Sequence, residues 1–155
     1  MANPKNPRAY RWRAHNPGRV LSNALRRFEE RVLALLGEAG HGQTRRSHVN
    51  LTRHLDLEGT RITELARRAA MTNAAMTELI DQCEALGLVE RTADPMDKRV
   101  RLVRFTANGL AWLDAFGRAV EQAEAEMASE IGKRCMSDLL TGLAHYAQAA
   151  EPAGA

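Results

Sequence analysis

The sequence predicts a mainly α-helical fold that carries one small β-hairpin. Two helix-sized segments lie close together, at residues 62–69 and 72–87. Two strand-sized segments follow at residues 88–92 and 100–105, with a charged loop between them. Two adjacent helices followed by a hairpin are the element order of a winged helix-turn-helix. Further helices are expected at residues 17–39, 46–57 and 106–131, the last of which Thr106 can cap, and in a final segment after Gly132.

The clearest helical pattern belongs to residues 72–87. Thr63 and Thr72 can each cap a helix N-terminus with a side-chain oxygen, so both helix starts are marked. Gly87 can leave the second helix in the left-handed conformation. Apolar residues at spacings of three and four predict one buried stripe, which consists of Met76, Leu79, Ile80, Cys83 and Leu86. The opposite face is expected to stay exposed.

The segment 93–99 is expected to be the wing between the two strands. Pro95 has no amide proton, so this segment cannot continue a strand ladder and must loop out. Residues 58–61 are interpreted as a turn that leads into the first of the two helices.

These residues resemble the MarR family of bacterial transcription regulators. The resemblance covers about a third of the chain, from Thr60 to Gly109, and rests on Leu79-Ile-Asp, Glu84, Leu86-Gly-Leu-Val-Glu-Arg91, Asp94-Pro-Met-Asp-Lys-Arg99 and Val103-Arg-Phe-Thr106. It implies a dimer in which the terminal helices of two subunits interdigitate. It also implies regulation, since many members are repressors that a small phenolic or anionic compound releases from DNA.

One globular unit with three parts is expected from 155 residues of which 45% are hydrophobic. The parts are a basic N-terminal arm (1–16), a helical dimerisation region (17–45 and 107–150) and a winged helix-turn-helix DNA-binding lobe (46–106). The apolar stripe of residues 17–39 is wider than one contact needs, which favours contacts with both its own domain and a partner. The Ala/Gly/Pro-rich end after Gln148 is expected to fray.

Charge is distributed unevenly along the chain. Residues 1–31 hold eight Lys or Arg against two Glu, whereas residues 107–155 hold three against seven acidic residues. A basic arm suits a polyanion such as DNA, and an acidic tail should point away from it. A solvated tail is the alternative for the arm, and Tyr10 and Trp12 within it favour packing at the base of a dimer.

Several other classes of protein are excluded by what the sequence lacks. No apolar run approaches the ~20 residues of a membrane span, and the start has no apolar signal region, so a cytoplasmic protein without a membrane partner is expected. No common catalytic or cofactor motif occurs, and the five histidines are scattered, which predicts no enzyme activity, no cofactor and no metal. Cys83 and Cys135 are interpreted as reduced thiols on apolar stripes, with thiol-based redox sensing as the alternative.

The exposed start of the helix 72–87 is the predicted reader of the major groove. Asn73 and Thr77 can reach base edges or phosphates, and the methyl group of Ala74 can touch a thymine methyl. The alternative is that Thr72 and Asn73 serve only as helix caps. Glu78 stands where the family often has arginine, and it can accept from a cytosine amino group or turn back toward Arg67 or Arg68.

In the wing, the resemblance assigns Arg99 to a DNA minor groove and Asp97 to orienting it. Three further cations, Arg91, Lys98 and Arg101, are expected to add positive charge nearby. In the alternative without DNA binding, the charged residues of this loop only solvate the hairpin tip and pair with one another. These residues are Asp94, Asp97, Lys98 and Arg99.

The helices 17–39, 46–57 and 106–131 are expected to border an effector cleft lined by Arg26, His48, Trp112 and Phe116, although each of these also suits ordinary packing or surface. The sequence thus predicts a homodimeric, sequence-specific transcription regulator on a pseudo-palindromic operator in double-stranded DNA, acting as a repressor that a small effector releases. The alternatives are a winged-helix protein-interaction module that does not bind DNA and a redox-sensing regulator.

Overall fold

The computed structural model describes residues 7–148 and confirms the predicted fold class. Helices make up most of the chain, and a three-stranded antiparallel sheet completes it. The first six residues of the predicted arm and the segment after Gln148 lie outside the described residues. Within residues 7–148, no helix combines the length and the apolarity that crossing a membrane requires.

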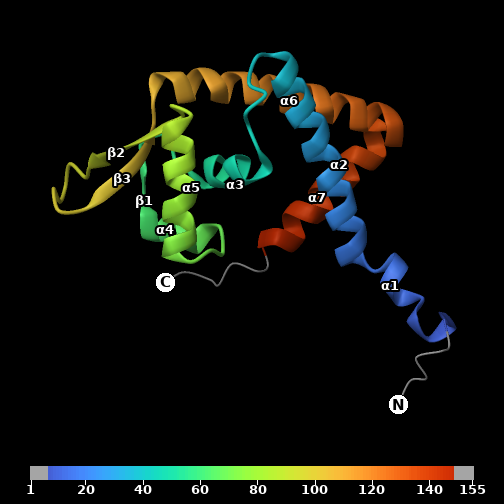
Figure 1. Ribbon diagram of the computed structural model, residues 1–155. Helices are drawn as coiled ribbons and strands as arrows, with labels where there is room; N and C mark the ends of the chain where they lie inside the picture. The colour runs from blue at the N-terminus through green and yellow to red at the C-terminus, as the bar shows by residue number, and fades with distance from the viewer. Residues whose placement is uncertain (1–6, 149–155) are drawn as a thin grey trace.

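Three long helices form one side of the molecule: α2 (Pro17–Glu38), α6 (Ala107–Ile131) and α7 (Lys133–Gln148). In Figure 1, α6 runs across the top, and α2 and α7 descend beneath it. The side chain of Thr106 accepts from Gly109 N at 2.9 Å and caps α6, as predicted. Gly132, with φ of 91°, separates α6 from α7 where the sequence indicated a break.

The other side is the lobe, which contains α3 (Arg46–His54), β1 (Thr60–Arg61), α4 (Ile62–Arg68), α5 (Asn73–Ala85), β2 (Val89–Ala93) and β3 (Arg101–Phe105). The strands lie in the order β1-β3-β2, so β3 is central, and Val103 pairs with both Thr60 and Arg91. A short 3-10 helix (Pro7–Tyr10) and α1 (Trp12–His15) precede α2.

Three local predictions were wrong in the lobe. The helix predicted for residues 46–57 ends at His54, because Leu55 is already extended. Residues 60–61 form the strand β1 rather than a turn, because they pair with β3, a long-range contact with no local signal. Thr63 does not cap α4: the chain enters this helix directly from β1, so Thr63 lies in the first turn and Arg61 occupies the cap position without a side-chain bond.

The core lies where α2 and α6 meet α3 and the rest of the lobe. Its fully buried side chains are Trp112, Leu36, Leu51, Leu65, Met76, Ile80, Val103 and Cys83. Trp112 donates its indole N–H to Thr44 Oγ1 at 2.9 Å and stacks on Phe116 with ring centroids 5.1 Å apart. Cys83 is the buried small hydrophobe that was predicted. Cys135 is exposed instead, because α7 packs chiefly on α6 within one chain and leaves its other face uncovered.

Gly109 is the tightest point between the two sides of the molecule. A Cβ at this residue would lie 1.9 Å from the backbone oxygen of Leu88, so α6 can approach the α5–β2 connection only if residue 109 has no side chain. Gly117 lies further along the same helix, and a Cβ there would meet nothing within 4 Å.

The substitution Gly109→Ala is therefore expected to destabilise the fold by about 2–3 kcal/mol, because the added methyl group forces the backbone apart. Gly117→Ala is the matched control, and it should stabilise by up to about 1 kcal/mol through helix propensity alone. Urea unfolding of the two variants and the unmodified chain measures both effects. Equal stability of the two variants would contradict the close approach.

Candidate nucleic-acid interface

The helix-turn-helix is formed by α4, α5 and the short turn between them. Ala70 in this turn has φ of 51°, and Met71 N donates to Ala66 O at 2.9 Å, which closes the end of α4. Thr72 then caps α5 by accepting from Ala75 N at 3.1 Å, as predicted. The predicted stripe is buried at Met76, Leu79, Ile80 and Cys83 and half-buried at Leu86. Packing of this stripe leaves the start of α5 facing solvent.

The exposed residues at the start of α5 differ in what they offer to DNA. Thr77 donates its hydroxyl proton to Asn73 O at 2.8 Å, so its side chain keeps only an acceptor and a methyl group for a ligand. The side-chain amide of Asn73 has no hydrogen-bond partner among residues 7–148, and it is exposed. Asn73 is the first residue of α5 and Thr72 is its cap, so of the two only Thr72 fits the capping alternative.

Glu78 is also exposed and makes no hydrogen bond or ion pair within the described part of the chain. The predicted alternative in which it turns back toward Arg67 or Arg68 is wrong. Both arginines bind Glu64 instead, at 2.7 and 2.9 Å, and Arg68 also bonds Asp56. These bonds hold the pKa of Glu64 at about 2. Glu78 therefore presents a free carboxylate next to Ala74 on the outer face of the helix.

The wing is a hairpin whose tip is organised by Asp94. This side chain is 6% exposed; one oxygen accepts from Met96 N and the other from Arg61, both at 2.9 Å. The bond from Met96 and then that from Arg61 lower the pKa of Asp94. The alternative that counted Asp94 among the solvated tip residues was wrong. Its partner Arg61 lies on β1, the strand that the sequence did not reveal, so no local pattern marked the contact.

Arg99 and Asp97 stand at the tip in the predicted relation. Asp97 Oδ1 accepts from the backbone N–H of Arg99 at 3.0 Å and from its Nε at 3.2 Å, and this pairing lowers the pKa of Asp97. The side chain of Arg99 remains 90% exposed despite this bond. Lys98 and Arg101 are exposed beside it. The tip thus presents one arginine whose direction is restrained by a carboxylate and two freer cations.

Arg91 behaves differently from the other wing cations. Its guanidinium bonds Glu84 and, at 2.7 Å, Asp81, and its backbone N–H donates to Glu84 Oε1 at 3.1 Å. Both carboxylates lie on α5, so Arg91 fastens the wing strand β2 to that helix. Its side chain is only 24% exposed. Arg91 thus holds the wing and the helix in a fixed relation.

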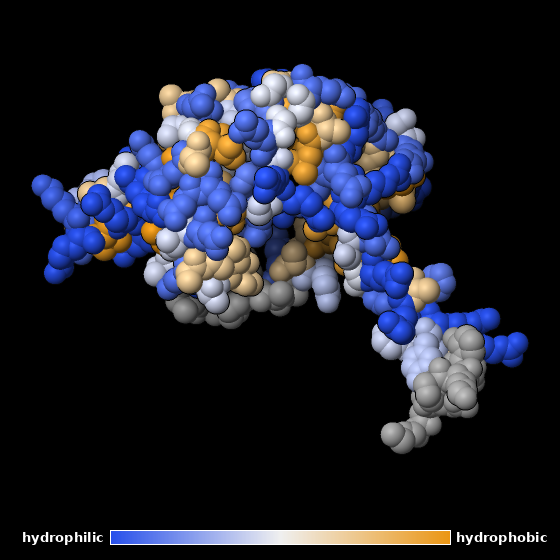
Figure 2. Space-filling model, viewed as in Figure 1, coloured by the Kyte–Doolittle hydropathy of each residue, from blue (hydrophilic) through white to orange (hydrophobic). Residues whose placement is uncertain are grey.

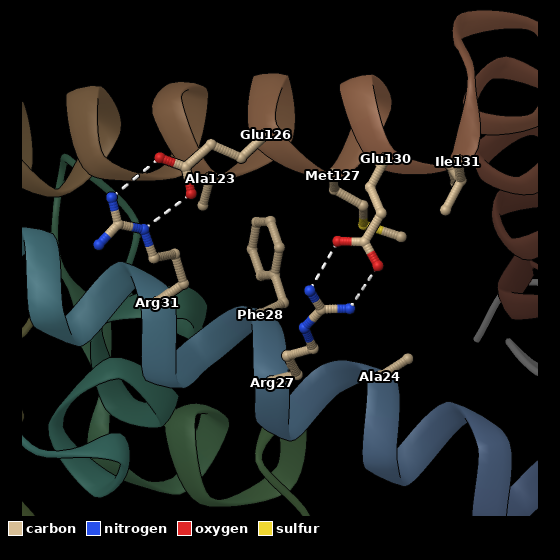
Figure 3. Close-up of a pocket in the computed structure, with 9 residues that line it drawn as sticks. All are labelled: Ala24, Arg27, Phe28, Arg31, Ala123, Glu126, Met127, Glu130 and Ile131. Atoms are coloured by element: carbon tan, nitrogen blue, oxygen red, sulfur yellow. Dashed lines mark hydrogen bonds and ion pairs between the residues drawn. The ribbon is translucent and has the colours of Figure 1, made fainter.

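The helical side contains a cavity of about 320 Å³ between α2 and α6. Figure 3 shows Phe28 standing between two ion pairs that connect the helices. Arg27 binds Glu130 at 2.6 Å, and Arg31 binds Glu126 at 2.7 Å. The bond from Arg31 holds the pKa of Glu126 at about 2. Each arginine at this cavity is therefore already matched by a carboxylate.

The four predicted effector residues do not share one cavity. Phe116 borders a hollow of about 80 Å³ between α2, α3 and α6, Trp112 borders one of about 190 Å³, and His48 borders one of about 510 Å³ beside Gln82. Arg26 is exposed on α2. Only Trp112 and Phe116 touch, through their stacked rings. The sequence predicted which helices border the cleft, but it did not reveal that packed side chains divide the space between these helices into separate hollows.

His48 fits the packing interpretation. It is 4% exposed, and its Nδ1 accepts from the backbone N–H of Arg45 at 3.1 Å, which closes the first turn of α3. Burial lowers the pKa of His48, and the charge of Arg45 lowers it further. In residues 7–148, no three His, Cys, Asp or Glu side chains are grouped so that they could hold a metal ion.

Comparisons with known proteins agree with this geometry. The model of the MarR family matches residues 44–100, from just before α3 to the tip of the wing. Over this segment the chain resembles the MarR family. MarR-family winged-helix proteins are transcription factors rather than enzymes. A curated relative, the uncharacterised HTH-type transcriptional regulator YdgJ of Bacillus subtilis strain 168, is 28% identical over 104 residues, 65% of this chain. The match spans 62% of YdgJ, less than two thirds of its length.

Solved structures show the same fold over most of this chain. Transcriptional regulator PA4135 has a TM-score of 0.71 at 19% identity, covering 89% of this chain and 99% of that one. CouR of Rhodococcus jostii RHA1 bound to p-coumaroyl-CoA has a TM-score of 0.67 at 23% identity, covering 84% and 90%. CouR bound to a 23-mer DNA duplex has a TM-score of 0.69 at 23% identity, covering 89% and 96%.

The two thiols should differ sharply in reactivity. Burial raises the pKa of Cys83 to about 12, so at pH 8 its thiolate fraction is lower by about a thousandfold than that of an ordinary thiol. In a Cys135→Ser variant, a thiol reagent is expected to leave the folded protein unmodified and to label Cys83 only after denaturation. Labelling of the folded variant within minutes would contradict this burial and reopen redox sensing at Cys83.

Proposed function

We propose that this chain is a DNA-binding transcription regulator that works as a two-fold dimer and acts as a repressor released by a small-molecule effector. The observation that carries the proposal is the pairing of two surfaces on one rigid lobe. The start of α5 is exposed and polar, and the wing tip presents Arg99 restrained by Asp97. A helix for the major groove beside an arginine for the minor groove is a DNA-reading arrangement.

The residues have distinct roles in this proposal. Asn73 reads a base edge with its free amide, and Ala74 meets a thymine methyl. Thr77 offers an acceptor, Glu78 accepts from a cytosine amino group, and Thr72 holds the start of the helix. In the wing, Arg99 enters the minor groove while Lys98 and Arg101 contact phosphates. Arg91 acts through position, because its guanidinium is engaged by α5. The structure of CouR bound to a DNA duplex supports a DNA-binding role for this fold.

Asn73 and Arg99 are expected to respond differently to replacement by alanine. Arg99→Ala removes a charged contact, so it should weaken cognate and scrambled duplexes by a similar factor and flatten the salt dependence. Asn73→Ala should leave the salt dependence nearly unchanged and cost ~1–3 kcal/mol on the cognate duplex, with little loss on scrambled DNA.

Salt titrations of both variants on both duplexes make the comparison, with a duplex selected from genomic fragments by the unmodified chain as the cognate sequence. If Asn73→Ala weakens the two duplexes equally, Asn73 is not a base reader, and that role passes to Thr77 or Glu78.

Exposed apolar side chains on the long helices support the dimer. On α2 these are Val20, Leu21 and Leu25, and on α6 and α7 they are Leu110, Ile131, Leu140, Leu143 and Tyr146. Figure 2 shows apolar patches in the region of α2 and α6 among largely hydrophilic surface. Large apolar side chains gathered on helices without a neighbour mark an interface. Two lobes held in this way fit half-sites about one helical turn apart.

The dimer can be tested with Leu140→Arg, which places a charge in the proposed interface. Leu57→Arg is the matched control, because Leu57 is an exposed leucine in the loop before β1. Light scattering at micromolar concentration should give twice the 17.2 kDa chain mass for the unmodified chain and the control, and the single-chain mass for Leu140→Arg. A single-chain mass for the unmodified protein, free and with DNA, would refute the dimer.

Effector release is the finer part of the proposal. The described p-coumaroyl-CoA complex of CouR supports a ligand-responsive fold. In this chain we place the effector beside Phe116, in the hollow between α2, α3 and α6.

This hollow has a volume of only about 80 Å³, so a ligand of ordinary size must widen it and displace the lobe. A tenfold loss of DNA affinity needs only about 1.4 kcal/mol of preference for the widened state. Release of labelled duplex by added compounds is the assay, and a ligand that binds without releasing DNA would argue against this role.

One observation favours a second function, a protein-interaction module that does not bind DNA. Residues 46–106 carry ten basic and nine acidic side chains, so the lobe is nearly neutral. A titration against random duplex DNA separates the two functions, because phosphate attraction is independent of sequence.

A further inference from the structure

The lobe has little positive charge to spare for DNA phosphates. Of its ten Lys and Arg side chains, seven are bound to carboxylates: Arg46, Arg53, Arg61, Arg67, Arg68, Arg91 and Arg99. The other three are Lys98, Arg101 and Arg104, which form no ion pair within the described residues. Sequence-independent affinity for DNA depends on cations that neutralise phosphates. A lobe with this balance needs positive charge from elsewhere in the molecule.

That charge lies at the start of the described chain. Residues 7–28 contain six arginines and no Asp or Glu, and the first carboxylate is that of Glu29. We use the name basic arm for residues 7–19, the described part of the predicted arm (1–16) together with the first turn of α2; its arginines are Arg8, Arg11, Arg13 and Arg19. The side chains of Arg11, Arg13 and Arg19 form no ion pair with any of residues 7–148. Trp12 in the same stretch is 65% exposed, so the arm also presents an aromatic side chain among its cations.

The arm has local structure that directs it away from the body. Asn16 accepts from Arg19 N at 3.0 Å and donates to Trp12 O at 3.1 Å, so one side chain joins α1 to the start of α2. The arm therefore extends outward from the N-terminal end of α2. In Figure 1 it extends toward the lower edge of the view, the side to which the N-terminal end of α5 also points. Figure 2 shows strongly hydrophilic patches on this extension, with paler surface between them.

We propose that the basic arm binds the phosphate backbone of the DNA duplex that α5 reads, and so adds to the sequence-independent attraction that the few free cations of the lobe supply. The inference rests on the proposed function, because it needs a DNA-binding chain. The guanidinium groups of Arg11, Arg13 and Arg19 suit phosphate oxygens, which accept two parallel N–H bonds from one arginine. The competing partner of the arm is the acidic surface of α6 on a second copy, and the test below separates the two.

The test compares Arg11→Gln/Arg13→Gln/Arg19→Gln with a matched variant, Arg118→Gln/Lys133→Gln/Arg134→Gln. The matched variant removes the same charge from exposed positions on α6 and α7. Fluorescence anisotropy over a range of salt concentrations measures binding to a random labelled duplex and to a selected one. Each lost phosphate contact lowers the slope of log K against log salt by about 0.9. The arm variant should lose about 3 units of slope per chain and weaken on both duplexes by the same factor, while the matched variant keeps most of the slope.

An unchanged slope in the arm variant would overturn the inference. If the arm variant with the unchanged slope also shifts toward the single-chain mass in light scattering, the arm binds the second copy and not DNA. Loss confined to the selected duplex would also overturn the inference, since phosphates carry no sequence. If the unmodified chain binds neither duplex, the proposed function fails together with the inference. Binding with an unaffected slope removes the inference alone.

Discussion

The junction at Thr106 is the contact on which the arrangement of the whole molecule depends. Thr106 donates its hydroxyl to Gly87 O, accepts from Gly109 N, and donates its backbone N–H to Leu88 O. One residue thereby joins the end of α5, the approach to β2 and the start of α6. Gly109 lets these backbones meet without an intervening side chain. Every displacement of the lobe relative to the long helices must strain this junction or pivot about it.

Charge pairing fixes the wing relative to α5 and β1. Arg91 ties β2 to α5, and Asp94 ties the wing tip to Arg61 on β1. These contacts connect strands and a helix that are separated in sequence, so α5 and the wing form one body. The same pairing neutralises most of the positive charge of the lobe. A surface that is geometrically ready for DNA is therefore electrostatically modest, which explains why the charge distribution along the chain matters to the proposed activity.

Local patterns in the sequence predicted the elements that depend on local physics. Thr72 and Thr106 cap helices where expected, and the apolar stripe around Ile80 is buried, because caps and periodicity act within a few residues. The errors concern partners distant in sequence. The pairing of β1 with β3 displaced the expected cap at Thr63, and the same strand supplies the partner of Asp94. Arg91 could be identified as a wing cation but not as a residue facing α5. The separate hollows beside His48, Trp112 and Phe116 follow from side-chain packing, which periodicity does not specify.

The length of α6 gives the junction at Thr106 a mechanical role. At a rise of 1.5 Å per residue, the 25 residues of this helix span about 37 Å. The lobe is attached at one end, and the ion pairs to α2 lie near the other. For a lever of this length, a tilt of about 5° moves the far end by roughly 3 Å, close to the spacing of one base pair. Small adjustments where α2 contacts α6 are thus larger at the lobe, and an energetically modest event among the long helices can put α5 out of register with the DNA groove that we propose it reads.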